Sequence, residues 1–384
     1  MPSETIRIIS DGAATFLDQV GDRDFNRGRL AVRVRRLAGG RREGVRLVEL
    51  VAGETKVFVL PDRGLGIWKM VAGTVELGWQ SPVAGPVHPA FVPLGEPSGL
   101  GWLDGFDELV ARCGLVSNGA PDFDAAGRLV HGLHGRIANL PVHELSVTLD
   151  DDAETITLTG AVDETRFLIH SLRLETQLVL SAARPRIAWT DTVTNRSDRP
   201  ATIQLLYHVN LGPPLLGCGG ELVAAIEELA PRDEAAAADI ATWNRYASPQ
   251  PGRGEQVHFA RIRPDNAGRA EALLVSPDSS QAAGLSWRAD TLPCFTLWKN
   301  QGGLNDGYVT GLEPGTNYPN PRSFEEARGR VVPLEPGASA TFELALEHLA
   351  GEQAVAERKA AIGSLAAASP PQIHARPRPE WSAG

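Results

Sequence analysis

Two polar side chains beside turn residues give this sequence its strongest chemical signal. His208 lies near the end of the apolar run 205–212, LLYHVNLG, and Glu313 lies in the segment 311–315, GLEPG. An imidazole and a carboxylate can act together as general acid and general base, because one gives a proton while the other takes one. We therefore predict acid–base chemistry without a cofactor, provided that the fold brings both groups into one pocket.

The residues around this pair indicate the rim of a sheet. In a regular strand Gln204, His208 and Asn210 share one face, and the Gly-Pro-Pro sequence at 212–214 ends the strand. Pro314 pushes Glu313 toward an extended conformation, and partial desolvation there would raise the pKa of its carboxyl group. The alternatives are a satisfied core histidine and a turn carboxylate in solvent.

A second group of candidates lies in the segment 130–139, VHGLHGRIAN. If this segment is an extended strand, His131 and His134 face opposite sides. His134 and Arg136 then share a face and can bind a sugar hydroxyl or ring oxygen. A polar strand edge explains the segment equally well. We predict no metal site, because neither a thiolate nor an HExxH partner accompanies the two histidines.

Trp298 and Arg63 are further candidates for contact with a sugar. Trp298 ends the predicted strand 294–298 and offers a flat ring for stacking, although core packing explains it equally well. Arg63 follows a strand and could direct a cation into the same cleft; the alternative is a structural ion pair with Asp62 or another acid. The sequence has neither a nucleotide-binding glycine motif nor a GxSxG elbow, and no spacing singles out a glycosidase pair.

Strand-like segments dominate the chain. They are rich in β-branched or aromatic residues and are bounded by turn residues. They lie at 45–50, 56–60, 154–160, 166–180, 186–194, 201–209, 256–262, 272–275, 294–298 and 340–346. Helical patterns occur only at 221–229, 352–362 and, more weakly, 233–240. The steady strand spacing predicts an all-β fold, a large antiparallel β-sandwich with few short helices.

Charge and composition narrow the function classes. The 384 residues include 37 basic and 47 acidic side chains, and the net charge of −10 argues against nucleic-acid and anionic-membrane partners. No run approaches the roughly 18 apolar residues of a membrane helix. The first eleven residues show no secretory signal, so we expect a cytoplasmic protein. The three widely spaced cysteines are expected to be free thiols.

We expect one domain over residues 1–365, with an N-terminal extension that includes strands at 1–44. The proline-rich segment 366–384 is expected to be an extended, peripheral tail. The loop 78–105 is rich in glycine and proline and contains Trp79 and Trp102. Long ordered loops of this composition are typically functional.

These motifs together resemble the galactose mutarotase-like superfamily, and in particular its divergent aldose 1-epimerase-like branch. His208 and Glu313 resemble the strand-end histidine and glutamate of mutarotases, and His134-Gly135 resembles their earlier His-Gly motif. Segments familiar in the divergent branch are PDRG at 61–64, GWQSP at 78–82 and LHGRIAN at 133–139. The similarity runs from about Val45 to His348.

The resemblance implies a β-supersandwich with a sugar cleft on one concave face. It implies that Glu313 takes the proton of the anomeric hydroxyl while His208 protonates the ring oxygen, so that the ring opens and recloses as the other anomer. His134 would help to position or polarise the ring oxygen. Further expected sugar contacts are Arg136, Arg63, His131, Asn210, Trp298 and Gln80. Two features depart from ordinary mutarotases: Val209-Asn210 replaces the usual aromatic cluster, and the loop 78–105 has no obvious counterpart.

The leading hypothesis is a cofactor-free aldose 1-epimerase that acts on a free or modified sugar, as a monomer or homodimer. The second hypothesis is a carbohydrate-binding protein that has kept the fold and lost the chemistry. The third is a sugar isomerase, lyase or hydrolase that uses the same acid–base pair on a different bond.

Overall fold

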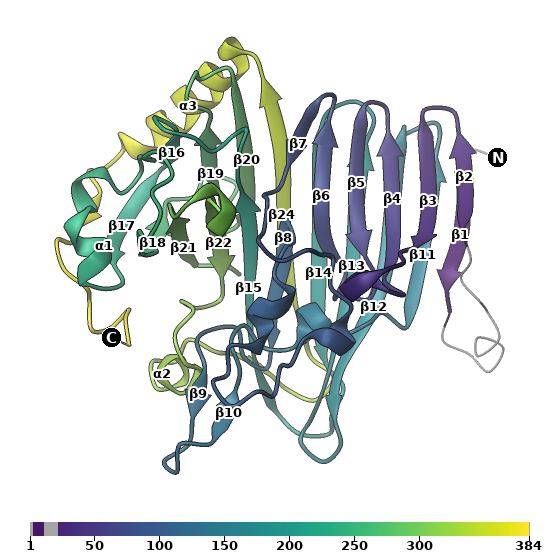
Figure 1. Ribbon diagram of the computed structural model, residues 1–384, viewed down its shortest axis with the longest axis horizontal. Helices are drawn as coiled ribbons and strands as arrows, with labels where there is room; N and C mark the ends of the chain where they lie inside the picture. The colour runs from purple at the N-terminus through teal and green to yellow at the C-terminus, as the bar shows by residue number, and fades with distance from the viewer. Residues whose placement is uncertain (1–2, 11–21, 384) are drawn as a thin grey trace.

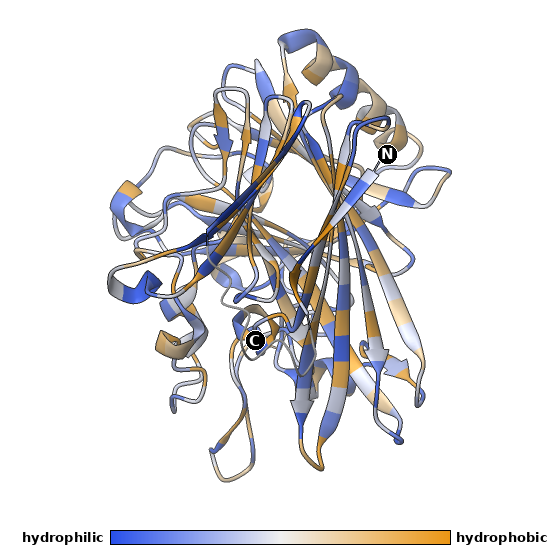
Figure 2. Ribbon diagram, turned by 90° about the vertical axis from the view of Figure 1, so that its right-hand side faces the viewer, coloured by the Kyte–Doolittle hydropathy of each residue, from blue (hydrophilic) through white to orange (hydrophobic). Residues whose placement is uncertain are grey.

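Two large antiparallel sheets dominate the molecule and pack as two layers. The computed structural model describes residues 3–10 and 22–383. Figure 1 shows the strands of both sheets, and Figure 2 shows the two layers nearly edge-on. The prediction of an all-β sandwich with few short helices is confirmed.

The first sheet has nine strands within the described residues. In spatial order they are β1 (Ser3–Ile9), β11 (Glu144–Asp150), β12 (Thr155–Arg166), β13 (His170–Ser181), β14 (Arg186–Asn195), β24 (Ser339–Ala350), β20 (Gln281–Arg288), β19 (Arg269–Val275) and β16 (Glu221–Ala224). Its long central strands alternate partly exposed and buried residues, as the pattern at 186–194 predicts.

The second sheet carries the candidate site. In spatial order its main path is β2 (Arg23–Arg27), β3 (Leu30–Arg36), β4 (Arg46–Ala52), β5 (Thr55–Leu60), β6 (Gly66–Ala72), β8 (Val110–Leu115), β15 (Ala201–Leu211), β22 (Val309–Gly315), β21 (Cys294–Asn300), β18 (Gln256–Ile262), β17 (Ile226–Pro231) and β25 (Gln372–Ile373). β7 (Val75–Leu77) pairs with β6, and β23 (Val332–Leu334) pairs with β15. A separate ribbon is formed by β9 (Asp122–Phe123) and β10 (Leu129–His131).

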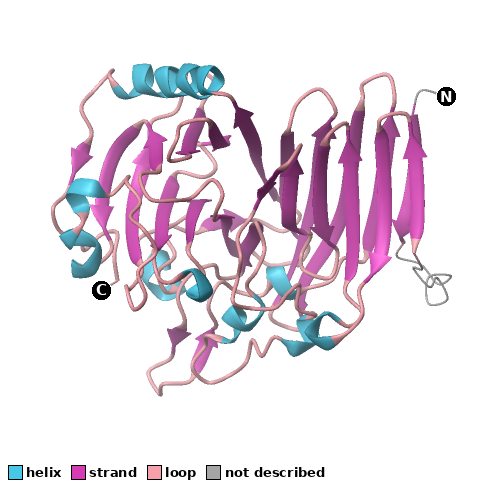
Figure 3. Ribbon diagram, turned by 45° about the horizontal axis from the view of Figure 1, so that its top comes forward, coloured by secondary structure: helices cyan, strands magenta, loops and turns pink. Residues whose placement is uncertain are grey.

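Apart from α3 (Glu352–Ala366), which lies along the outside of the molecule, the helices are short (Figure 3). In the described part of the chain the other α-helices are α1 (Glu234–Ala238) and α2 (Arg322–Glu326). Short 3-10 helices lie at Gly40–Arg42, Pro89–Phe91, Gly101–Gly105, Ile137–Asn139, Ile240–Thr242 and Leu304–Asp306. None of the helices within residues 3–10 and 22–383 is long and apolar enough to cross a bilayer. All three cysteines are free thiols, as expected.

A buried polar network joins the two sheets behind the candidate site. Asp191 of β14 is fully buried and accepts hydrogen bonds from Arg112 of β8 (Nε to Oδ2, 2.5 Å; Nη2 to Oδ1, 3.1 Å). The hydroxyls of Tyr207 (2.9 Å) and Thr176 (2.6 Å) bind the same carboxylate. Tyr207 points into the core between the sheets, where it binds Asp191. Because adjacent residues of a strand point to opposite faces, His208 points away from that core.

Replacement of Asp191 by alanine is expected to lower the free energy of unfolding by about 3–5 kcal/mol, because the guanidinium of Arg112 then stays buried without its counter-charge. Urea denaturation would measure this loss. Asp290→Ala, which breaks an exposed pair with Arg288, is the matched control and should leave stability nearly unchanged. Equal effects of the two substitutions would contradict the role of the network.

The helix predicted at 221–229 is wrong. Its residues form β16, which pairs with β19 in the first sheet, and β17, which pairs with β18 in the second. Alanine, glutamate and leucine favour a helix locally, but burial of Leu222 and Leu229 between ladder partners outweighs that preference. The helix predicted at 352–362 is confirmed as α3, and α1 lies within the weaker candidate.

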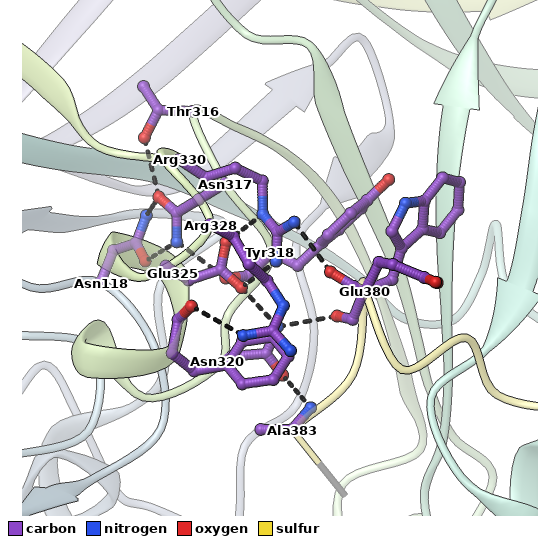
Figure 4. Close-up of polar contacts among 12 residues, drawn as sticks. Asn118, Thr316, Asn317, Tyr318, Asn320, Glu325, Arg328, Arg330, Glu380 and Ala383 are labelled. Atoms are coloured by element: carbon purple, nitrogen blue, oxygen red, sulfur yellow. Dashed lines mark hydrogen bonds and ion pairs between the residues drawn. The ribbon is translucent and has the colours of Figure 1, made fainter.

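The C-terminal segment is mostly exposed, as expected, but it is anchored at two points. β25 adds a parallel strand to β17, and the buried ring of Trp381 packs on Tyr318 with 5.0 Å between centroids. Asn320 donates to the carbonyl of Trp381 and accepts from the amide of Ala383, as Figure 4 shows. The expected extension at 1–44 likewise contributes β1, β2 and β3 to the sheets, while residues 1–2 and 11–21 of it lie outside the described residues.

Candidate active site

The second sheet brings His208 and Glu313 face to face. β15 pairs antiparallel with β22 in a register that sets Leu206 opposite Gly315 and Asn210 opposite Gly311. His208 and Glu313 are therefore directly opposed, and their side chains leave the same face of the sheet. The two residues are about a hundred positions apart in the sequence, and the hydrogen-bonded pairing of β15 with β22 brings them together.

Aromatic rings enclose this pair on the face opposite the core between the sheets. The ring centroid of His208 lies 5.0 Å from Phe106, 5.4 Å from Trp298 and 6.3 Å from Trp102. Trp102 and Phe106 come from the end of the loop 78–105 and the residue that follows it. That loop therefore forms part of the site, and it supplies apolar walls that exclude water from the pair.

The two groups are close and almost completely buried. Nε2 of His208 lies 3.2 Å from Oε1 of Glu313, and the residues are 5% and 2% exposed. Burial raises the pKa of Glu313 well above its ordinary value, the nearby charge of Glu255 raises it further, and Arg232 opposes the shift. Burial, and then His134, lowers the pKa of His208 well below its ordinary value. Desolvation therefore favours the uncharged form of both groups.

Asn210 determines the tautomer of His208. The amide Nδ2 of Asn210 donates to the carbonyls of Glu108 (2.9 Å) and His208 (3.1 Å), so its Oδ1 faces Nδ1 of His208 at 2.6 Å. Nδ1 must then carry the hydrogen, and in the neutral ring Nε2 presents a lone pair to Glu313. The pair consequently holds one mobile proton, on the Glu313 carboxyl group or on Nε2 of His208.

His134 lies beside the pair in a fixed orientation. Its ring is 5.4 Å from His208 and 4.6 Å from Trp102, and its Nδ1 donates to the carbonyl of Asn118 (2.9 Å). Asn118 is held by reciprocal amide hydrogen bonds of 2.8 Å with Asn317, as Figure 4 shows. Burial lowers the pKa of His134 to about 4. The neutral ring therefore offers Nε2 as a hydrogen-bond acceptor.

Three buried polar atoms around the pair lack a hydrogen-bond partner among the described residues. They are Oε1 of Glu313, Oγ1 of Thr296 and Nε1 of Trp102. Oε1 of Glu313 lies within ion-pair distance of His208, but the contact does not have hydrogen-bond angles. Thr296 is directly opposite Glu313 on β21 and shares its face. Buried polar atoms are rarely left unpaired, so this group indicates a place for a polar ligand.

An ion pair between Glu255 and Arg232 lies beside Trp298, one of the aromatic rings around the site. Nε1 of Trp298 donates to Oε2 of Glu255 (2.8 Å), and Arg232 binds Oε1 of the same carboxylate (2.9 Å). The Glu255 and Arg232 side chains are 48% and 34% exposed. The charges of both act on Glu313: Glu255 raises its pKa and Arg232 lowers it.

Two predicted sugar contacts, Arg63 and Gln80, lie away from the pair, and a third, Asn210, lies beside His208 in another role. Arg63 is 1% exposed and binds Glu108 (2.8 Å), Asn139 and the carbonyl of Gly105, so the alternative of a structural ion pair is correct, with Glu108 rather than Asp62 as partner. Asn210 uses its amide to orient His208. No contact joins Gln80, an exposed residue, to the pair within the described residues.

The shared face predicted for His134 and Arg136 is also wrong, because the segment is a turn and not a strand. His134 (φ 56°) and Gly135 (φ 71°) both have left-handed backbone conformations. A Cβ at Gly135 would lie 2.0 Å from the carbonyl oxygen of Ser117, so only glycine fits there. The turn directs His134 toward His208, while His131 and Arg136 line a separate cavity.

Trp102, Phe106, Thr296 and Glu255 were missed as site residues. The composition of the loop 78–105 was the available signal for Trp102, and Phe106 follows that loop by one residue. Thr296 is two residues from Trp298 on the same strand, so strand parity could have identified it. Nothing in the local sequence marks Glu255, which reaches the site only through the pairing of β18 with β21.

Gly311 leaves the space that the pair occupies. A Cβ there would lie 2.4 Å from Oε1 of Glu313 and 3.1 Å from Cε1 of His208. Gly311→Ala is expected to displace the carboxylate, to lower stability by about 1–3 kcal/mol, and to suppress any turnover. Thermal unfolding and anomer exchange would measure both effects. Gly363→Ala in α3, where an added Cβ meets nothing within 4 Å, is the control; it should leave exchange unchanged and should not lower stability, because alanine favours a helix more than glycine does.

Solved structures share this architecture. A proposed aldose 1-epimerase from Klebsiella pneumoniae subsp. pneumoniae MGH 78578 superposes with a TM-score of 0.93 at 29% identity, covering 98% of this chain and 99% of that one. A galactose mutarotase-like protein from Clostridium acetobutylicum gives a TM-score of 0.56 at 14% identity, covering 84% and 99%. A proposed aldose 1-epimerase from Escherichia coli K12 gives 0.55 at 16%, covering 80% and 100%. The last two show the common fold alone.

The fold thus defines a protein of the galactose mutarotase-like class, in a divergent branch of it. Within that class, residues 42–348 match the model of the family described as a domain of unknown function, DUF4432, and the chain belongs to this family. No curated protein matches the sequence significantly.

Proposed function

We propose that this protein is an isomerase of the aldose 1-epimerase type, which interconverts the anomers of a free or modified sugar. The observation that carries the proposal is the buried opposition of His208 and Glu313 at 3.2 Å, with Oε1 of Glu313 lacking a hydrogen-bond partner among the described residues. The similarity to the Klebsiella pneumoniae protein described as a proposed aldose 1-epimerase supports the same reaction.

The single mobile proton of the pair matches what ring opening requires. With the proton on His208 and Glu313 ionised, Glu313 takes the hydrogen of the anomeric hydroxyl and Nε2 of His208 gives its hydrogen to the ring oxygen. The C1–O5 bond breaks as the C1=O1 bond forms, and rotation about C1–C2 exposes the other face. The reverse transfers close the ring as the opposite anomer, and the pair regains its starting state.

The remaining side chains of the site are suited to holding the sugar. Neutral His134 offers Nε2 as an acceptor for a hydroxyl, so it does not donate to the ring oxygen. Trp102, Phe106 and Trp298 provide ring faces for the C–H groups of the sugar. Glu255 and Arg232 at the edge can bind the outer hydroxyls.

Exchange NMR spectroscopy over a panel of aldoses tests the proposal. The protein is expected to accelerate α/β interconversion of at least one aldose, with no change in substrate mass. A folded protein that binds a sugar without accelerating exchange would be a carbohydrate-binding protein and would overturn the proposal. A product of different mass would establish a lyase or hydrolase instead.

A further inference from the structure

A second cavity lies behind the turn that carries His134. It has a volume of about 600 Å³ and lies between the segment 129–136 and the turn end of the hairpin formed by β12 and β13. Its polar lining includes Ser117, His131, Arg136, Glu164, Arg166 and His170. Of these residues, none belongs to the His208–Glu313 site.

The cations of this cavity are not engaged elsewhere. Neither Arg136 nor Arg166 has a side-chain hydrogen bond or ion pair within residues 3–10 and 22–383, and both are exposed. By contrast, Arg63 and Arg232 are each paired with a glutamate. Two unpaired guanidinium groups at one cavity favour a ligand with an anionic group.

The deeper wall of the cavity offers groups that suit hydroxyls. Ser117 is 2% exposed, and its Oγ has no hydrogen-bond partner among the described residues. Glu164 is 3% exposed; its Oε2 accepts from the amide of Leu115 (2.7 Å), and its Oε1 is 4.0 Å from Nε2 of His170. Burial raises the pKa of Glu164, which reduces its repulsion of an anion.

The two histidines act as neutral polar groups here. Burial, and then the charges of Arg136 and Arg166, lowers the pKa of His170. Burial, and then Arg322, lowers the pKa of His131. The permanent charge on the cavity therefore comes from the arginines, and the imidazoles add one donor and one acceptor each.

We propose that this cavity is a binding site, separate from the His208–Glu313 site, for a small hydroxylated anion. Its phosphate or carboxylate group lies against Arg136 and Arg166, and its hydroxyl groups bind Ser117 and Glu164. Both sites share one turn: His134 lies in the first site, and His131 and Arg136 lie in the second.

Isothermal titration of the full chain with inorganic phosphate, gluconate and glucose tests this inference. Saturable 1:1 binding of phosphate or gluconate is expected, and the better ligand distinguishes a phosphate from a carboxylate source. The double variant R136Q/R166Q should weaken that binding at least about tenfold, because two charge-assisted contacts are lost. Arg184→Gln, at an exposed arginine on a distant turn, is the matched control and should bind as the unmodified chain does.

Two further results would overturn the inference. The first is the absence of saturable binding of either anion, or equal binding by R136Q/R166Q and the unmodified chain. The second is a loss of anion binding in Glu313→Gln or in excess glucose, because either would place the anion in the His208–Glu313 site. Since the readout is binding, its failure leaves the proposed epimerase reaction untouched.

Discussion

Glu313→Gln is expected to abolish anomer exchange while making the protein more stable at neutral pH. The amide keeps the size of the carboxyl group but cannot take the proton of the anomeric hydroxyl. The loss of a positioned general base typically costs about 10²–10⁴-fold in rate, so exchange should fall close to the uncatalysed level. Sugar binding should change little, because the aromatic walls remain.

The gain in stability follows from the raised pKa of Glu313. In the unfolded chain this group ionises near its ordinary value, whereas burial in the folded protein resists ionisation. Because the pKa of this carboxyl group is higher in the folded protein, the free energy of unfolding falls as pH rises above the pKa in the unfolded chain. It stops falling once the pH exceeds the pKa in the folded protein. Glutamine removes that loss of stability. The difference in melting temperature between Glu313→Gln and the unmodified chain should therefore grow as pH rises from 4.5.

Glu357→Gln on the exposed side of α3 is the matched control and should alter neither rate nor melting temperature. Retained exchange in Glu313→Gln would remove Glu313 as the base. A lower melting temperature at pH 7 would show instead that the carboxylate is stabilised by its surroundings, and would contradict the direction of the pKa shift.

Local patterns were sufficient to predict the central strands of the site. The apolar run at 205–209 and the turn residues after Asn210 predict a strand end with His208 and Asn210 on one face, and the structure confirms their contact at 2.6 Å. Pro314 and the flanking glycines predict an extended Glu313, which β22 confirms. These predictions succeed because side-chain parity along a strand depends only on the strand itself.

The predictions that failed depend on contacts between distant segments. Arg63 was a candidate for the cleft because it follows a strand, but its partner Glu108 is 45 residues away. The turn at His134-Gly135 has two residues in the left-handed conformation. Glycine is required at position 135 because the carbonyl groups of Gly114 and Ser117 pack against it. Neither contact produces a repeating pattern of residues from which it could be predicted.

The rate of exchange in the unmodified chain is expected to fall on the acid side only below pH 6.5. The pair is competent when it holds one proton, and its two titration steps belong to the pair as a whole. The lowered pKa of His208 places the gain of a second proton well below pH 6.5. The raised pKa of Glu313 moves the loss of the last proton well above pH 4.5. The acid limb of kcat/KM should therefore lie below pH 6.5.

His208→Gln should lower kcat about 10²–10⁴-fold, because the ring oxygen loses its proton donor. It should also change the profile: with Glu313 alone, the residual rate should rise with pH as that carboxyl group ionises. His258→Gln, at a buried histidine on β18, controls for the loss of a buried imidazole elsewhere and should keep the profile of the unmodified chain. An acid limb centred at or above pH 6.5 in the unmodified chain would mean that His208 is protonated in the resting protein. Asn210 and Glu313 would then bind the imidazolium form of His208. The proposed reaction, which uses one mobile proton on the pair, would have to be rewritten with two.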